Sequence, residues 1–487
     1  MKTTFRENGT KADLAAPETG KLSGRLSATG VTLTVLGYVA PLAAAAGYVP
    51  LVIGYGNGIG APLSFAVVGF MLLIFAVGYT AMVRAVPRPG GFYTYITAGL
   101  GKVIGVGSGF LAAALYILAG VGFAIFGGLA AQSFFLNAVG IDIPWWIYVV
   151  GYLSIAGFCA YRGADFNGRV LGVIVMIEVI VLTAFIVFSV VSGGPEGRSA
   201  EPFTLGGFTS GSISIGILFA STLYGGFEST ALYREEVRDP DRSIPRATYT
   251  LVIIMTVLYG ATAYALITAI GIDNIAATAA EDPASVMTMA IDQQVGHMAS
   301  LVVSALLLLS ALASQLATVN ATSRYFFSFA ADRLLPHNLA IAHPRLGSPH
   351  RAAMLTVTIF ALVVLAVVVT GTDPVLAYGT FGGVGIFAFQ TLLLLVSLSC
   401  IVYFIRNGRG GRSIWTVAIA PTISVIAIAV LLWYSATQAT LLLGVPTVLT
   451  PIGFGFVGLS FIVGCLYALW LRTRRPRVYA GVGRQAS

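Results

Sequence analysis

The sequence predicts an all-α integral membrane protein with twelve transmembrane helices. Hydrophobic residues make up 57% of the 487 residues and charged residues only 9%, and the mean hydropathy is +0.89, which excludes an ordinary soluble protein. A helix needs about 20 apolar residues to cross a bilayer. Twelve segments of about this length occur, at residues 30–53, 60–83, 105–135, 144–161, 168–192, 211–233, 246–271, 297–329, 352–370, 374–405, 413–436 and 447–471.

The distribution of basic residues supports this topology, because short cytoplasmic loops collect Lys and Arg. With both termini inside, the inner segments hold 26 of the 27 basic residues, and only Arg198 lies outside. The net charge of +8 is then explained by loops that lie beside anionic lipid. The expected partner is therefore the lipid bilayer, and no nucleic acid is expected.

The remaining composition predicts neither a cleaved leader nor a metal site. Residues 1–27 are polar and mixed in charge, so we expect a cytoplasmic tail without a removable signal peptide. Cys159, Cys400 and Cys465 lie within apolar segments and lack the spacing of metal ligands, which predicts packing roles. We expect no metal and no cofactor.

The stretch from Phe219 to Ala247 predicts a broken helix that leaves the membrane. It contains Gly225-Gly226, and backbone groups freed inside hydrocarbon must be satisfied by protein or by a water-filled cavity. Glu228 follows, and an ionisable side chain in a spanning segment normally faces a bundle interior or a pathway. A dense run of charge from Arg234 onward then marks the water boundary.

The first apolar segment contains a second candidate interruption. Pro41 follows Ala40 and stands shortly before a run of alanines. Proline removes a backbone donor and clashes with the preceding helical turn, which predicts a broken helix here too. An ordinary proline kink, with the alanines allowing close helix packing, is the alternative.

The two candidate interruptions lie five segments apart, and four further segments follow each of them. This pattern is typical of an inverted repeat of five helices each, with the substrate near the midplane where the broken helices meet. An odd number of spans in each repeat gives the two repeats opposite orientations. The expected organisation is an N-terminal tail, two repeats, two extra helices and a C-terminal tail, at residues 1–27, 28–192, 211–405, 412–471 and 472–487.

Two acids, Glu178 and Glu228, lie well inside apolar segments. Glu178 is roughly 15 Å deep at 1.5 Å per residue. It is either a neutral carboxylic acid bonded to a neighbouring helix or a group that carries a proton. Three roles are open for Glu228: binding an amine, carrying a coupling proton, or holding the broken helix together.

Three ordered motifs resemble those of the amino acid, polyamine and organocation transporter superfamily. They are Gly226-Phe227-Glu228 with the charged run that ends at Ala247, then Pro89 to Tyr95, then Asn320 to Arg324 with Asp332 to Pro336 downstream. The resemblance covers roughly residues 25 to 470. It implies the leucine-transporter type of fold, with the first and sixth helices broken.

The resemblance also implies substrate-binding positions on three helices. On the first helix, the run of backbone N–H groups that would bind a substrate carboxylate matches Ala43, Ala44 and Ala45, and we expect Ala40 and Pro41 to bind substrate with them. The positions implied on the sixth and third helices are Thr222, Leu223, Gly225, Tyr116, Ile117 and Val121. A bulky aromatic often stands where this chain has Thr222, which indicates a roomier site.

Proton coupling is the preferred expectation. Proton-coupled relatives often carry a lysine on the fifth helix, whereas the four Lys of this chain lie outside the spans and Glu178 occupies approximately that region. A sodium site would need oxygen ligands from the first and eighth helices, where Ser314 is a candidate. Glu178, Glu228 and Ser314 are therefore the coupling candidates.

The predicted function is secondary active transport of amino acids or related amines by alternating access, in the bacterial inner membrane, as a monomer or dimer. An amino acid/polyamine exchanger and a non-transporting amino-acid sensor are the alternatives. An enzyme is not expected, because no Ser/His pair, His cluster or group of acids occurs within the spans. The chain also lacks a GxxxxGK[ST] loop, which argues against a self-contained ATP-driven pump.

Overall fold

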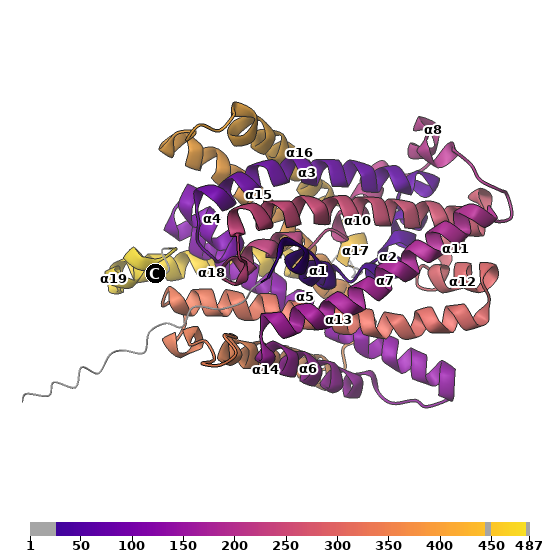
Figure 1. Cartoon of the computed structure of the whole chain (residues 1–487), viewed down its shortest axis with the longest axis horizontal. Helices are drawn as coiled ribbons and strands as arrows, with labels where there is room; N and C mark the ends of the chain where they lie inside the picture. Colours follow the sequence, from indigo (N-terminus) through magenta and orange to yellow (C-terminus); the bar gives the residue numbers. More distant parts are fainter. Residues whose placement is uncertain (1–25, 444–449, 484–487) are drawn as a thin grey trace, which may run out of the picture.

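The computed structural model describes residues 26–443 and 450–483, and the regular elements within these ranges are helices (Figure 1). The tail expected at residues 1–27 therefore lies almost wholly outside the described residues. The long helices are α3 (Ala61–Ala85), α5 (Lys102–Val139), α6 (Trp145–Arg162), α7 (Ala164–Ser192), α10 (Pro240–Ile270), α13 (His297–Ala331), α14 (His350–Val369), α15 (Pro374–Asn407), α16 (Ala420–Thr437) and α18 (Thr450–Arg474).

Shorter helices form the interruptions and the connections. They are α1 (Ala28–Val39), α2 (Pro41–Leu51), η1 (Val52–Asn57), η2 (Gly58–Gly60), α4 (Gly91–Leu100), η3 (Glu201–Phe203), α8 (Leu205–Phe208), α9 (Ile213–Thr222), η4 (Phe227–Glu236), α11 (Ile272–Glu281), α12 (Val286–Gln294), η5 (His337–Ala340), η6 (Trp415–Ile419), α17 (Ala439–Leu443) and α19 (Pro476–Gly481).

Nine helices of the described ranges are long and apolar enough to cross a membrane. The chain is therefore a multi-pass integral membrane protein. One of the nine, Pro41–Ala85, joins α2 to α3 through η1 and η2, and so combines parts of two expected segments. The expected segment at 211–233 is absent from this count because it is divided between α9 and η4, each of 10 residues.

The first expected interruption is present at Ala40. This residue ends α1 with a left-handed backbone, φ 48° and ψ 75°, and α2 begins at Pro41. Proline disfavours a helical conformation in the residue before it, yet fits the first position of a helix. The interruption therefore precedes Ala43, Ala44 and Ala45, which lie inside α2.

The second expected interruption separates α9 from η4, a 3₁₀-helix. α9 ends at Thr222, and η4 begins at Phe227 after the glycine pair. Gly226 has a φ of 107°, and a Cβ atom added to it would lie 2.0 Å from the Tyr38 ring. Glycine is therefore required here by both the backbone and the close approach of α1.

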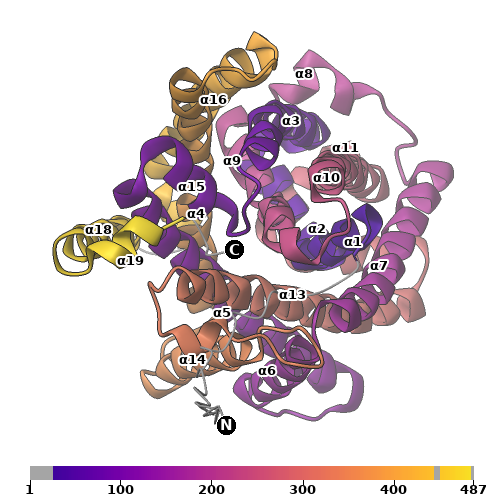
Figure 2. The same cartoon turned by 60° about the vertical axis from the view of Figure 1, so that its left-hand side comes forward.

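The two broken helices lie together inside the bundle. α1 contacts η4, and α2 contacts α9. Figure 2 shows α1 and α2 beside α7, α10 and α13, while α16 and α18 lie at the edge. The backbone N–H of Leu26 donates to the Glu236 carbonyl at 2.9 Å, which ties the residues before α1 to the end of η4.

The residues after α18 return to the end of the bundle that carries α4. Lys102 Nζ donates to the carbonyl oxygens of Tyr479 and Ala480, at 2.9 and 2.6 Å. Arg88 Nη1 donates to the Gly483 carbonyl at 2.8 Å. The segment around α19 is therefore held against the connection between α3 and α5.

Candidate functional site

A cavity lies where the two broken helices face α5 and α15. Its empty volume is about 640 Å³, which includes space open to the outside. Its walls come from five elements: the end of α1, the inner face of α2, the middle of α5, the α9–η4 interruption, and α15. The lining residues are Tyr38, Tyr48, Leu115, Ala119, Gly122, Phe123, Thr222, Gly225, Gly226, Glu228, Tyr378, Phe381, Gly382, Gly385, Ile386 and Phe389.

Glu228 is the one ionisable acid among these lining residues, and it is 2% exposed. Its Oε1 accepts a hydrogen bond from the Tyr116 hydroxyl at 2.7 Å, and its Oε2 accepts one from the Gly226 N–H at 2.9 Å. Its backbone carbonyl accepts from the Tyr79 hydroxyl at 2.7 Å. Glu228 thus binds the backbone of the interruption and also presents a carboxyl group to the cavity.

Gly225 leaves space that a side chain would fill. A Cβ atom added to it would have only the Thr222 carbonyl oxygen nearby, at 3.7 Å. The neighbouring Gly226 has no such room, because Tyr38 packs against it. The glycine pair therefore combines one residue that borders open space with one that allows tight packing.

Glu178 lies at the other interruption. It extends from α7, is 1% exposed, and its Oε2 accepts a hydrogen bond from the backbone N–H of Leu42 at 3.2 Å. The next N–H, that of Ala43, donates to the Ser310 hydroxyl of α13 at 3.1 Å. Because the first N–H groups of a helix have no partner within the helix, Glu178 and Ser310 satisfy the start of α2.

Several polar atoms near this region are buried without a partner among the described residues. They include Glu178 Oε1, the Tyr259 hydroxyl, Ser314 Oγ and both polar atoms of the Gln315 side chain. Buried polar groups are usually paired with protein or water. The interior face of α13 therefore carries polar side chains, Ser314 and Gln315, that have no hydrogen-bond partner among the described residues.

The substrate-binding residues implied by the resemblance occupy different places. Thr222 and Gly225 lie on the cavity wall. Tyr116 is fully buried and reaches the cavity through Glu228. The other implied residues do not line the cavity. Six of them are buried elsewhere, namely Leu223, Val121, Ala40, Pro41, Ala43 and Ala45, and Ala44 is half-buried in α2. Ile117 lines an apolar groove between α5, α13 and α18.

The structure adds wall residues that sequence reasoning missed. Six of them are aromatic: Tyr38, Tyr48, Phe123, Tyr378, Phe381 and Phe389. In the sequence they stand within apolar segments, where an inward-facing ring has the same pattern as a lipid-facing one. The glycines of the α15 segment, residues 382, 383 and 385, were a usable signal, because small residues mark close contacts between membrane helices.

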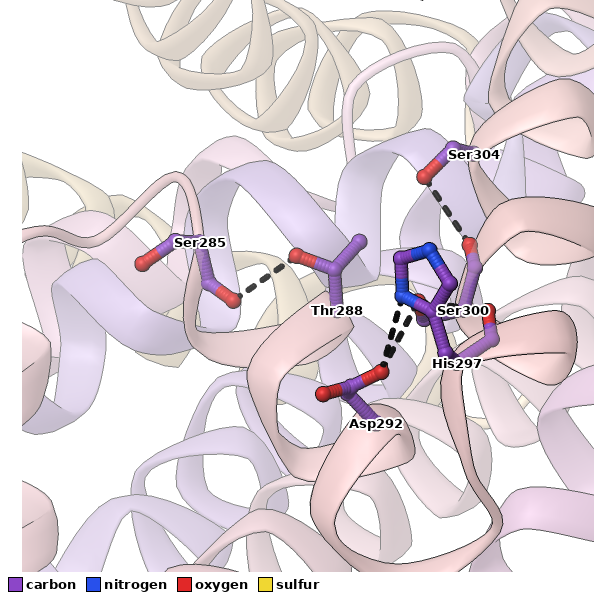
Figure 3. A network of polar contacts seen from close by, with 6 residues as sticks. All are labelled: Ser285, Thr288, Asp292, His297, Ser300 and Ser304. Atoms are coloured by element: carbon purple, nitrogen blue, oxygen red, sulfur yellow. Dashed lines mark hydrogen bonds and ion pairs between the residues drawn. The ribbon is translucent and has the colours of Figure 1, made fainter. Parts of the chain in front are cut away.

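A polar cluster occurs at the beginning of α13 (Figure 3), and its residues are not among those that line the cavity. His297 Nδ1 lies 3.3 Å from Asp292 Oδ1, and the Ser300 hydroxyl lies 3.5 Å from the same oxygen. Both partners of the pair are well exposed, with side chains 76% and 48% accessible. Exposed pairs of this kind stabilise little, so we interpret it as a surface contact of the α12–α13 turn.

In the described part of the chain, no group of three or more His, Cys, Asp or Glu side chains is placed to hold a metal ion. His343 and His350 pack edge to face against each other and against Tyr161, outside the cavity. The chemistry available in the cavity is therefore recognition by a carboxyl group, backbone groups and aromatic rings.

Comparisons with known proteins all find transporters or permeases. The family model described as "Amino acid permease" matches residues 30–478. An uncharacterized transporter of Mycobacterium tuberculosis is 27% identical, over 67% of this chain and 70% of its own length. The branched-chain amino acid permease BcaP of Lactococcus lactis is 25% identical (72% and 74%), and the low-affinity putrescine importer PlaP of Escherichia coli is 24% identical (69% and 72%).

Proposed function

This chain belongs to the amino acid permease family, and we propose that it is a secondary active transporter that moves amino acids or related amines by alternating access. The observation that carries the proposal is the cavity between two broken helices, with the carboxyl group of Glu228 on its wall. Broken helices supply free backbone groups and helix ends at the depth where a polar substrate must be held.

The proposed architecture is the leucine-transporter type, with twelve transmembrane helices. Residues 28–192 and 211–405 would be the inverted repeats, and residues 412–471 would form two extra helices. The positions of the two interruptions support this proposal, because α1–α2 begins the first repeat and α9–η4 begins the second. Contact between α1 and η4 and between α2 and α9 is the arrangement that a pseudo-two-fold axis would give.

The proposed coupling ion is the proton, which would enter the cell together with the substrate by symport. Glu178 and Glu228 are buried carboxyl groups, and each binds the backbone at one interruption. Gain or loss of a proton would change the bond that holds the second half of each broken helix. Ser314 is the remaining candidate, since its buried hydroxyl has no partner among the described residues.

The proposed location is the inner membrane of a bacterium, with both termini in the cytoplasm. The support is the distribution of charge, because 26 of the 27 basic residues fall on one side of the expected topology. Amino acids or amines are proposed as substrates on the family match and on relatives named for branched-chain amino acids and putrescine.

The experiment that tests this proposal is uptake into proteoliposomes. The purified protein is reconstituted, a panel of labelled amino acids and amines is offered, and a pH gradient, acidic outside, is imposed or omitted. We expect accumulation that the gradient increases and that a protonophore abolishes. Counterflow without any response to the gradient would favour an exchanger. Binding without flux would favour a sensor and would contradict transport.

A further inference from the structure

The described cavity wall carries an acidic side chain but no basic one. Its described lining contains Glu228 but no Lys, Arg or His. A ligand with a carboxylate would therefore meet a carboxyl group and find no basic side chain. A carboxylate could instead be bound by the positively polarised N-termini of the half-helices that follow each interruption. The start of η4 lies on this wall at Gly226 and Glu228, and α2 begins three residues after Tyr38 of the wall.

Both of these N-termini already hold a carboxyl group of the chain. At α2, Pro41 has no N–H, the N–H of Leu42 donates to Glu178, and that of Ala43 donates to Ser310. The N–H of Ala44 completes the turn by donating to the Ala40 carbonyl at 2.8 Å. At η4, the N–H of Gly226 donates to Glu228. The N–H groups of Leu42, Ala43 and Gly226 at these two helix starts are thus already bonded to side chains from α7, α13 and η4.

The helix ends with the opposite polarity border the cavity. α1 ends at Val39 and α9 ends at Thr222, and Tyr38 and Thr222 lie on the cavity wall beside these ends. The C-terminal end of a helix carries partial negative charge, which favours a cation. Together with Glu228, two such ends make the polar part of the cavity a site for an ammonium group.

The remaining wall is aromatic and apolar. Six rings line the cavity, and Tyr38 packs edge to face on Phe123 with ring centroids 6.1 Å apart. Aromatic faces attract cations and also cover apolar groups. Gly122, Gly382 and Gly385 leave the wall between the rings without side chains. The site therefore fits an ammonium group attached to an apolar body.

We infer that the cavity selects amines with an apolar body and without an α-carboxylate, because Glu178 and Glu228 occupy the two half-helix N-termini. This inference names a substrate class for the proposed transporter and so rests on the proposed function. It separates this chain from a permease that binds the zwitterionic form of an amino acid through its carboxylate.

Matched pairs of compounds test the inference on the full-length protein in detergent. Phenethylamine and phenylalanine differ only by the carboxylate, as do 3-methylbutylamine and leucine. Binding is measured by thermal stabilisation and by calorimetry. We expect each amine to bind at least ten-fold more tightly than its amino acid, and phenylalanine methyl ester to bind like the amine. Equal or tighter binding of the amino acids, or binding of neither amine, would overturn the inference.

Variants add a second test of the reason for this selectivity. Glu178→Ala frees the N–H of Leu42, so we expect the preference for phenethylamine over phenylalanine to fall, whereas Glu178→Gln keeps an acceptor and should change it less. Should Glu178→Ala fail to fold, Ser310→Ala frees the N–H of Ala43 instead. An unchanged preference in the variant that frees a donor would contradict the assigned role of the capped N-terminus.

The binding assay also keeps this inference separate from the proposed function. Amines that bind the detergent-solubilised protein but give no flux in proteoliposomes would contradict transport and support the substrate class. Gradient-driven uptake of leucine or phenylalanine in preference to the amines would support transport and contradict the substrate class.

Discussion

Arg324 and Glu236 form a buried two-pronged ion pair between α13 and η4. Arg324 Nε donates to Glu236 Oε1 at 2.7 Å, and Nη2 donates to Oε2 at 2.9 Å. The side chains are only 3% and 2% accessible. The guanidinium group lies over the Tyr233 ring at 4.3 Å, and Nη1 donates to the Asn320 carbonyl at 2.9 Å. The charged end of the second broken helix is thereby fixed to a long neighbouring helix.

Removing one partner of this pair should lower the stability of the folded protein more than removing both. Arg324→Met leaves the Glu236 carboxylate buried without its counter-charge, which typically costs about 3–5 kcal/mol. The double variant Arg324→Met with Glu236→Leu should recover much of this loss, because no lone charge remains. Thermal unfolding of the four proteins in detergent provides the cycle, and additive losses would contradict the expectation.

A surface pair serves as the control for this cycle. Arg242 Nε lies 3.9 Å from Asp239 Oδ2, and both side chains are well exposed, at 76% and 55%. Substitution of an exposed residue away from special features usually changes stability by no more than about 0.5 kcal/mol. Arg242→Met should therefore unfold close to the unmodified protein.

Much of the fold could be predicted from the sequence, because its signals are local. Apolar segments of membrane-spanning length gave the positions of the long helices, and Pro41 and Gly225-Gly226 gave the two interruptions. The exact residue of the first interruption was harder to predict from the sequence. The family resemblance placed the substrate-binding run of backbone N–H groups at Ala43 to Ala45, whereas the effect of Pro41 on the residue before it places the interruption at Ala40.

The cavity could be predicted only in part, because its walls depend on how distant helices turn. The family resemblance implied Thr222 and Gly225, which lie on the wall, but nothing local shows which face of α15 carries Tyr378 and Phe381 inward. The bond between Glu178 and Leu42 joins residues 136 positions apart. Depth in the membrane singled out Glu178, but its partner at the start of α2 could be identified only from the packed structure.

Glu178→Gln should weaken gradient-driven uptake while the protein remains folded. The amide is close in shape and keeps an oxygen that can accept from the N–H of Leu42, so α2 should stay in place. It cannot take up or release a proton under these conditions. Initial uptake rates are measured in proteoliposomes at several external pH values. We expect at least a ten-fold loss of the stimulation by the pH gradient, with counterflow largely retained.

Glu281→Gln is the matched control for this substitution. Glu281 ends α11 and is exposed, and a change there should leave the pH dependence as it is. If the Glu178→Gln protein keeps the original pH profile, Glu178 has a packing role and the coupling group must be sought elsewhere.

Gly225→Leu should abolish ligand binding without unfolding the protein. A Cβ at this position meets only the Thr222 carbonyl, so the added side chain would extend into the cavity and occupy the volume that a ligand needs. Gly151→Leu is the control, because Gly151 lies on an exposed face of α6 with nothing within 4 Å of an added Cβ. Thermal stabilisation by added ligand is compared, and retained affinity in Gly225→Leu would remove the interruption from the binding site.

The Tyr93 hydroxyl should make the docking of the C-terminal segment sensitive to alkaline pH. It donates to Asp332 Oδ2 at 2.6 Å, and the N–H of Gly483 donates to the same carboxylate oxygen at 2.8 Å. Burial and the nearby Asp332 charge raise the pKa of Tyr93 above its ordinary value of 10.0. The unfolded chain therefore loses this proton before the folded one does.

The sign of the effect follows from that order of ionisation. The contribution of Tyr93 is complete below pH 10 and decreases as the pH rises toward the raised pKa of the folded state. The stability advantage over Tyr93→Phe should consequently shrink by up to about 1.4 kcal/mol per pH unit above this point. Thermal unfolding of both proteins at pH 8 to 11 measures the difference in stability between them. Ionisation of the other buried tyrosines affects both proteins alike and cancels in this difference. An advantage that stays constant across this range would show that the Tyr93 proton is not needed for docking.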